Sequence, residues 1–397
     1  MTPITVDSGV LLTASKLYET ARSSADGTVK TLAKTLDDNW GCAGSDSAGG
    51  AWAKSYDPAA FKAVAAGTEI VNSFGKLHDL LAATGVSHAN TEKSNKRPPE
   101  PPDAAPAQLP KATAPLFKGA FGGTTPEPFG WDLIAGWLQG HTWPNGDGDR
   151  LRKVGDAWYG AAKSLREASS AVGPAWPALE DVVSDEIFLA IVQMDLVAAT
   201  VENVALQFEN LGSACRGWAQ KIEDAHREIL RILAWALGIG LTAGIIVGIF
   251  TGGTGATVTT GGVGSGAAAL IVTVIVGFEA ASAVAVGATV AAGVAAGGAV
   301  LNLQPLLEAS PTQFNADTGS KAGGAELPKS TAESVSKKLD GYLLNPTHPV
   351  GGPKAKWFEQ ALGFNKSNAD NLDLKLYSTP PLRSRPEQLS SVQNSIK

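Results

Sequence analysis

The apolar residues between positions 201 and 229 recur at alternating intervals of three and four. They are Val201, Val204, Phe208, Leu211, Cys215, Trp218, Ile222, Ala225 and Ile229. This spacing places all of them on one stripe of an α-helix, because 3.6 residues make one turn. A stripe of this length needs another element to cover it, so the segment predicts a long helix packed along an antiparallel neighbour.

The neighbour is predicted directly upstream. Asp147 or Asp149 is suited to cap the start of a helix whose stripe follows at once. That stripe consists of Leu151, Val154, Trp158, Ala161, Leu165 and Ala168. Pro174 and Pro177 end the helix, because proline lacks the amide hydrogen that a helix interior requires. Residues 129–230 are therefore predicted to form one helical hairpin.

Residues 1–95 carry a similar pattern and predict another helical hairpin. The first stripe is Ala25, Val29, Leu32 and Leu36, and the second is Ala60, Val64, Gly67, Val71, Phe74, His78 and Leu81. Asp57 followed by Pro58 is typical of an N-cap and first helical residue, so the second helix is predicted to begin there. Residues 96–128 are rich in proline and predict an extended linker. Residues 305–332 predict a second linker.

Residues 231–304 contain two apolar stretches around a Gly/Thr-rich turn. Ile232–Phe250 has no charged residue and is long enough to cross a hydrocarbon core of about 30 Å. Ala267–Val300 contains one carboxylate, Glu279. The many small residues would let two helices approach closely in a bilayer. We predict a transmembrane hairpin in contact with a lipid bilayer; the alternative is a hairpin buried in a larger helical assembly.

Composition excludes several classes of function. A formal net charge of -6 gives no reason to expect the whole chain to bind nucleic acid. The two cysteines, Cys42 and Cys215, exclude a disulfide-rich scaffold and a zinc cluster built on cysteine, and the stripe position of Cys215 favours a buried thiol. No metal-ligand cluster, P-loop or nucleophile elbow is present, so no metal and no cofactor is predicted. The N-terminus shows no Sec-type signal peptide.

Both hairpins resemble proteins of type VII secretion systems of actinobacteria. The first, with NWGCAG at its turn, resembles the small WxG-type helical hairpins exported by these systems, on Trp40 and Gly41. The second, with WPNGD before its helix, is similar to the N-terminal domains of large type VII effector toxins, on Trp143 and Trp158. The resemblance implies export-related roles for these four residues. It also implies that the partner is the secretion machinery or a helical WxG-type protein.

Residues 333–397 resemble the start of a small toxin domain found in contact-dependent inhibition and other polymorphic-toxin proteins. The matching residues include Tyr342, Asn345, Pro346, Lys356, Trp357, Phe358 and Gly363. The resemblance implies a nuclease-like activity, RNA as a substrate and a cognate immunity protein. His348, Lys354 and Lys356 are the candidates for acid–base and phosphate chemistry, although they also suit turn and helix-start positions.

The family continues into β-strands, whereas the segment after Leu376 has the composition of coil. We hypothesise that a frameshift near residue 375 truncated the domain and inactivated it.

The predicted fold class is mainly α: two antiparallel helical-hairpin modules, an apolar Gly/Ala-rich membrane hairpin, and a small helical remnant of an α+β toxin domain. The predicted function is that of a secreted or surface-delivered polymorphic toxin that acts between bacteria, exported by a type VII-like system and associated with a membrane. The alternative is a non-enzymatic, membrane-associated interaction protein with a vestigial toxin tail.

Overall fold

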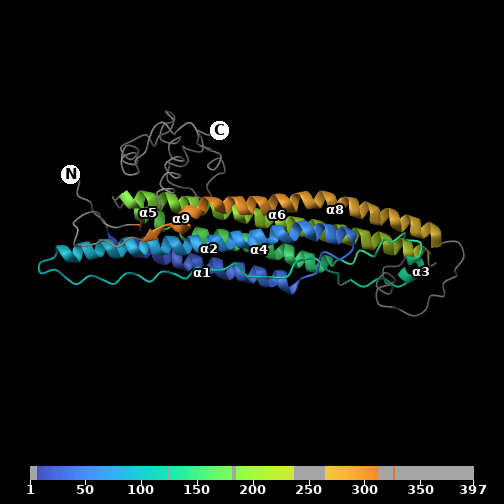
Figure 1. Ribbon diagram of the computed structural model, residues 1–397, viewed down its shortest axis with the longest axis horizontal. Coiled ribbons are helices and arrows are strands. Elements are labelled where there is room, and N and C mark those ends of the chain that lie inside the picture. Colours follow the sequence, from blue (N-terminus) through green and yellow to red (C-terminus); the bar gives the residue numbers. More distant parts are fainter. Residues whose placement is uncertain (1–6, 124, 181–184, 237–263, 312–324, 327–397) are drawn as a thin grey trace, which may run out of the picture.

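A computed structural model of the protein describes residues 7–123, 125–180, 185–236, 264–311 and 325–326. This part of the chain is mainly helical, which confirms the predicted fold class at that level. Figure 1 shows an elongated bundle with its long helices side by side along one axis. The short elements are α3 (Trp131–Ala135), α5 (Ala175–Glu180), η1 (Leu301–Leu303), α9 (Gln304–Glu308) and the paired strands β1 (Ser310–Pro311) and β2 (Ala325–Glu326).

Helices α1 (Ser8–Asp38) and α2 (Ser47–Asn95) pack along each other and are joined by a short turn. The turn continues directly into α2, because the carboxylate of Asp46 accepts a hydrogen bond of 3.0 Å from the Gly49 amide and caps the helix. The prediction that this helix begins at Asp57 is therefore wrong: Pro58 lies inside it. The Asp57 carboxylate instead accepts a hydrogen bond of 2.7 Å from the amide of Ala120 in the linker.

Helices α4 (Gly148–Ala171) and α6 (Asp185–Ala236) form the second pair. Asp147 caps α4 by accepting a hydrogen bond of 3.0 Å from the amide of Arg150. Near the opposite end, the guanidinium of Arg166 bridges to Glu202, at 2.6 Å, and to Glu209. A guanidinium that joins two carboxylates by paired bonds holds the two helices in register.

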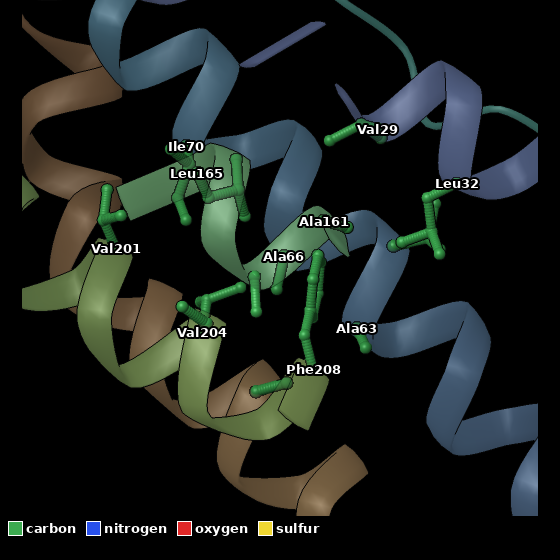
Figure 2. Packing of buried hydrophobic residues seen from close by; sticks show 14 of the residues in the cluster. Val29, Leu32, Ala63, Ala66, Ile70, Ala161, Leu165, Val201, Val204 and Phe208 are labelled. Atoms are coloured by element: carbon green, nitrogen blue, oxygen red, sulfur yellow. The ribbon is translucent and has the colours of Figure 1, made fainter. Parts of the chain in front are cut away.

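The two pairs cover each other's apolar faces. Figure 2 shows side chains from all four helices meeting in one core: Val29 and Leu32 of α1, Ala63, Ala66 and Ile70 of α2, Ala161 and Leu165 of α4, and Val201, Val204 and Phe208 of α6. At Gly67, an added Cβ would lie only 3.1 Å from Val29 and 3.2 Å from Phe208, so a small residue is needed where α1, α2 and α6 converge. Burial of each large side chain here contributes about 1.5–3 kcal/mol.

Helix α8 (Gly264–Val300) lies against α2 and α6. The Phe278 ring stacks on Trp218 of α6 with centroids 4.8 Å apart. Farther along, Gly293 approaches α2 so closely that an added Cβ would lie 2.6 Å from the Cα of Ala59. The small residues expected to pair two helices within a bilayer thus serve, at this position, to pack α8 on the bundle.

The predicted transmembrane hairpin of residues 231–304 is not found in that form. Among the helices that the structure describes, none has the length and apolar character needed to cross a membrane. The first apolar arm lies outside the described residues from position 237 onward. The second arm is α8, which packs as described above. The alternative of a hairpin arm packed against other helices therefore describes α8 better.

The Pro-rich linker is extended, as predicted, but it is bound to the bundle along its length. Polar side chains of α2 hold its backbone. Asn72 bonds both the amide and the carbonyl of Ala112, at 2.8 and 3.2 Å, and Asp79 accepts from the amide of Leu109 at 3.0 Å. The linker thereby becomes part of the surface of the first helix pair.

Candidate interaction site at the turn end of the bundle

Three segments that lie far apart in sequence meet at the turn between α1 and α2. The segment before α4 contributes Asn145 and Asp147. The amide of Asp147 donates to the carbonyl of Cys42 at 2.9 Å, and the side chain of Asn145 accepts from the Ser45 amide at 2.7 Å. The Asn145 amide also donates to Asp46 at 3.1 Å. These hydrogen bonds hold the NWGCAG turn and the WPNGD segment, the two sequences that carry the type VII resemblance, in contact with each other.

The end of the linker forms the third segment. Its backbone pairs with the turn: the amide of Ala43 donates to the carbonyl of Ala120 at 2.8 Å, and the amide of Gly122 donates to the carbonyl of Gly44 at 3.3 Å. Gly41 has a φ of 72° and Gly122 a φ of 137°, backbone angles that glycine adopts without strain. An added Cβ at Gly122 would lie 2.9 Å from the Cα of Gly41. The glycine after Trp40 is therefore required by the turn itself.

Trp40 presents its ring at this surface. Its side chain is 46% exposed, and the Nζ of Lys118 lies 5.3 Å from the ring centroid. Other large apolar side chains of the linker and of α2 are also exposed. We define the Trp40 patch as Trp40, Phe61, Leu116 and Phe121. Lys118 lies over the Trp40 ring, and Phe61 stacks on Phe117, the residue after Leu116, with centroids 4.4 Å apart.

Trp143 is buried and serves the fold of this end. It stacks on the imidazole of His226 with centroids 4.3 Å apart and meets Trp131 edge-on at 5.5 Å. The Nε2 of His226 donates to the carbonyl of Pro144 at 2.5 Å. Burial lowers the pKa of His226 below its usual value, because the charged imidazolium loses hydration there.

Trp158 lies deeper in the core. Its indole nitrogen donates to the hydroxyl of Tyr56 at 2.7 Å. Tyr56 stacks on Trp52 at 4.5 Å, and Trp52 in turn stacks on Trp218 at 5.8 Å. Together with Phe278 these rings form a continuous aromatic column that links α2, α4, α6 and α8. Of the three tryptophans with predicted export-related roles, only Trp40 therefore exposes its ring to a partner.

The two cysteines are buried, free thiols. Burial raises the pKa of the Cys42 thiol to about 12 and raises that of Cys215 well above its usual value. A thiol that stays protonated is a poor nucleophile and metal ligand. This agrees with the predicted structural role of Cys215 and extends it to Cys42.

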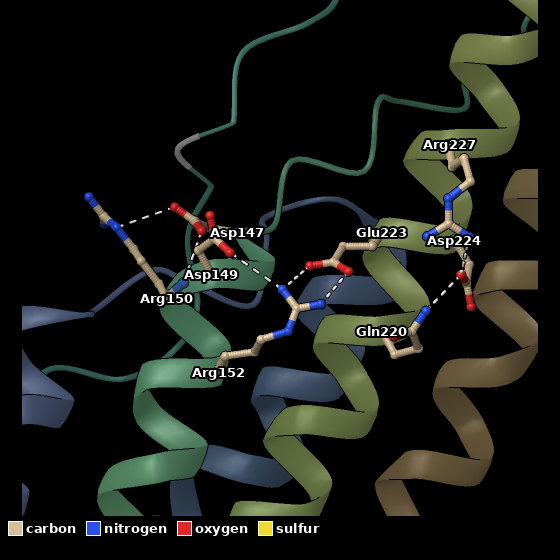
Figure 3. A network of polar contacts seen from close by, with 8 residues as sticks. All are labelled: Asp147, Asp149, Arg150, Arg152, Gln220, Glu223, Asp224 and Arg227. Atoms are coloured by element: carbon tan, nitrogen blue, oxygen red, sulfur yellow. Dashed lines mark hydrogen bonds and ion pairs between the residues drawn. The ribbon is translucent and has the colours of Figure 1, made fainter. Parts of the chain in front are cut away.

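A polar network fixes the start of α4 to α6 beside the turn. Figure 3 shows Arg152 of α4 reaching the Glu223 carboxylate of α6 and the neighbouring Asp149. The adjacent residue of α6, Asp224, accepts from Gln220 at 2.8 Å and from Arg227 at 3.0 Å. These groups are largely paired with one another, so the network positions the helices rather than forming an open charged site. In residues 7–311, gaps apart, no three metal-ligating side chains cluster.

The remaining site predictions fall on the C-terminal region. Tyr342, Asn345, Pro346, His348, Lys354, Lys356, Trp357, Phe358 and Gly363 all lie outside the described residues. Their roles stay predictions. Conversely, the sequence interpretation missed Phe61, Leu116 and Phe121. For Leu116 and Phe121 the available signal was their place in a Pro-rich linker, because a fully solvated linker rarely contains large apolar residues. Phe61 lies in α2 and gave no such signal.

Comparison with known families matches two regions of the chain. Residues 124–271 match the family of WXG100 like domains, and residues 327–380 match a domain of unknown function, DUF6883. The first match contains α3, α4, α6 and the first residues of α8. It supports the resemblance to WxG-type proteins for the second helix pair.

Curated relatives come from mycobacteria. The chain is 27% identical over 240 residues to the outer membrane channel protein CpnT of Mycobacterium tuberculosis and, equally, of Mycobacterium bovis; the alignment covers 59% of this chain and 28% of CpnT. It is 29% identical over 177 residues to Mav of Mycobacterium avium, which is named provisionally as an NAD(+)–arginine ADP-ribosyltransferase; this covers 44% of the chain and 21% of Mav. The chain therefore spans about a quarter of these relatives. No solved structure matches it significantly.

Proposed function

We propose that this protein is an effector exported by a type VII-like secretion system to the cell surface or the medium. The helical bundle is the delivery unit, and residues 333–397 are the toxin-like cargo. The match to WXG100 like domains supports the first part of the proposal. The similarity to CpnT and Mav, whose names describe an outer membrane channel and an NAD(+)–arginine ADP-ribosyltransferase, supports a role outside the cytoplasm.

The Trp40 patch is proposed as the surface that the export machinery recognises. The observation that carries this proposal is a half-exposed tryptophan at a turn whose backbone is fixed by hydrogen bonds from two other segments. A rigid aromatic side chain loses little conformational freedom on binding, which is why tryptophan is frequent at binding hot spots. The other tryptophans with predicted export roles are buried: Trp143 packs on His226 beside the segment before α4, and Trp158 lies in the aromatic column of the core.

The helical WxG-type partner is proposed to lie within the chain itself. The first helix pair covers the apolar face of the second, so a separate helical protein would have no stripe left to cover in this core. We expect a monomer in solution. Co-purification with a stoichiometric helical partner that displaces one helix pair would contradict this part of the proposal.

The export proposal is tested by secretion from an actinobacterial host with a functional type VII system. Trp40→Ala is expected to reduce the protein in the culture medium at least tenfold without lowering its level in the cell. The matched control is Trp137→Ala, which removes another half-exposed indole at a different place in the bundle. Equal secretion of the Trp40 variant and the parent protein would overturn the proposed recognition surface.

For the C-terminal region we propose a toxin domain of nuclease type, opposed by an immunity protein. His348, Lys354 and Lys356 are the proposed groups for RNA cleavage. The test is growth of bacteria that express the full chain or its His348→Ala variant. The proposal is supported if the full chain is toxic, if the His348→Ala variant is not, and if co-expression of a neighbouring gene product also removes the toxicity of the full chain. Absence of toxicity from the full chain would contradict the proposal for this region.

The second candidate function is a membrane-associated interaction protein without enzymatic activity. The observation that favours it is a set of exposed apolar side chains where α6 ends and α8 begins. Contact with a lipid bilayer is common to both candidate functions.

A further inference from the structure

The end of the bundle that carries α3 has a core of its own. Helix α3, the last turns of α6 and the first turns of α8 bury apolar side chains against one another, separately from the main core. The cluster contains Trp131, Ile134, Leu138, Trp143, Ile229, Leu230, Ile232, Leu233, Ala234, Ala267, Ala268, Ile271 and Ile275. This end is therefore a packed structure rather than a frayed terminus.

Four large apolar side chains of the same end point outward instead. We define the tip patch as Leu133, Trp137, Trp235 and Leu270. Trp137 is 53% exposed and Trp235 is 61% exposed. Their helices already have enough inward-facing apolar residues to form the core described above, so folding of this end does not explain why indoles stand on its surface. Large exposed apolar side chains gathered at one end of a molecule are a candidate interaction surface.

Charge distribution indicates what that surface contacts. Residues 232–278 contain no charged side chain, and within residues 264–300 the one charged group is Glu279. The Glu279 carboxylate lies 3.6 Å from the Nδ1 of His141, so it is paired within the protein. The nearest charges on α6 are the pair formed by Arg231 and Glu228, 3.6 Å apart. In α3 the charged side chain is the exposed Asp132, next to Leu133. The described part of this end thus offers a protein partner few charges to recognise, and the tip patch offers anionic lipid no basic group.

The last described turns of α6 and the first turns of α8 both lie at this end. The structure describes α6 as far as Ala236 and α8 from Gly264 onward, and the sequence of residues 237–263 is uncharged. Tryptophan favours the boundary between headgroups and acyl chains, because its ring is apolar while its N–H keeps a polar partner. Exposed indoles next to an uncharged apolar sequence fit a bilayer surface better than they fit water.

We propose that the tip patch docks on the surface of a lipid bilayer, with Trp137 and Trp235 at the level of the headgroups. This inference rests on the membrane contact included in the proposed function, and it assigns that contact to named residues. Because the tip patch contains no basic side chain, docking depends on apolar contact. It therefore changes little with the anionic lipid content of the membrane or with salt.

The experiment measures binding of the full chain to vesicles of phosphatidylcholine, alone or with phosphatidylglycerol, by co-sedimentation. A Trp137→Ser/Trp235→Ser variant is expected to bind at least about tenfold more weakly. On docking, each tryptophan side chain would lose contact with water over roughly half of its surface area of about 150–250 Å². Leu206→Ser, at a 44% exposed position of α6 outside both patches, is the control and is expected to bind within about twofold of the parent. Unchanged thermal unfolding shows that the variants are folded.

The possible results distinguish a failure of the tip patch as the docking surface from a failure of the proposed membrane contact. If the parent binds and the double variant binds equally well, the tip patch is not the docking surface, although membrane contact stands. If the parent does not bind either vesicle, membrane contact itself fails and the inference fails with it. Binding that requires phosphatidylglycerol and disappears in high salt would also overturn the inference. So would a dimer of the parent that the double variant converts to a monomer.

Discussion

Replacement of Trp218 by alanine tests how α8 is attached to the bundle. The Trp218 ring is fully buried, stacks on Trp52 and Phe278, and its indole nitrogen donates to the carbonyl of Ala43 at 3.2 Å. Loss of so large a buried ring costs about 3–5 kcal/mol through lost contacts and the cavity left behind. The total stability of such a domain is about 5–15 kcal/mol, so the variant should be strongly destabilised.

The assay is urea unfolding followed by circular dichroism, with Trp218→Phe as the matched variant. Phenylalanine keeps a stacked ring but leaves the Ala43 carbonyl without its donor, which should cost about 1–3 kcal/mol, clearly less than alanine. A double-mutant cycle between Trp218→Ala and Phe278→Leu should give a coupling of about 0.5–1.5 kcal/mol. A loss below about 2 kcal/mol for Trp218→Ala, or a coupling near zero, would refute the placement of α8 against α6.

Three further predictions concern the turn end. Gly122→Ala should lower the free energy of unfolding by about 1–3 kcal/mol, because the φ of 137° strains alanine and its Cβ would lie 2.9 Å from Gly41; an unchanged melting temperature would argue against the paired turn. Cys42 and Cys215 should react with a thiol reagent at pH 8 only after unfolding, because both are buried with raised pKa values; rapid labelling of the native protein would contradict their burial. The pKa of His226 is lower in the folded protein than in the unfolded chain, so as the pH falls the unfolded chain binds a proton at this residue first. The free energy of unfolding should therefore decrease as the pH drops below about 6.5. In thermal unfolding at pH 7.5 and 5.5, His226→Phe should show a smaller difference between the two melting temperatures than the parent.

The helical stripes were predictable from the sequence because they depend on local periodicity alone. Val204, Phe208 and Trp218 recur with the helical period, and all are buried in the core. The N-cap at Asp147 was also predictable, since a carboxylate before a helix has few other roles. Asp57 misled the interpretation because an Asp-Pro pair also fits a helix interior when the carboxylate binds another segment, here the amide of Ala120.

The placement of α8 and the linker could not be predicted in the same way. Small apolar residues permit close contact between helices both in a bilayer and in a helical bundle, so the sequence alone fits either environment. The close approach of Gly293 to Ala59 shows that α8 packs on the bundle. The polar residues that hold the linker, such as Asn72 and Asp79, are indistinguishable in sequence from solvated residues on a helix surface. The Trp40 patch depends on both features, since the docked linker supplies Leu116 and Phe121.

The central claim is that the bundle is a delivery unit for a type VII-like export system. The most direct measurement is the amount of full-length protein in the medium of two isogenic actinobacterial hosts, one with an intact system and one without its export ATPase. The account predicts protein in the medium of the intact host and retention inside the cells of the other. Equal amounts outside both hosts would contradict it.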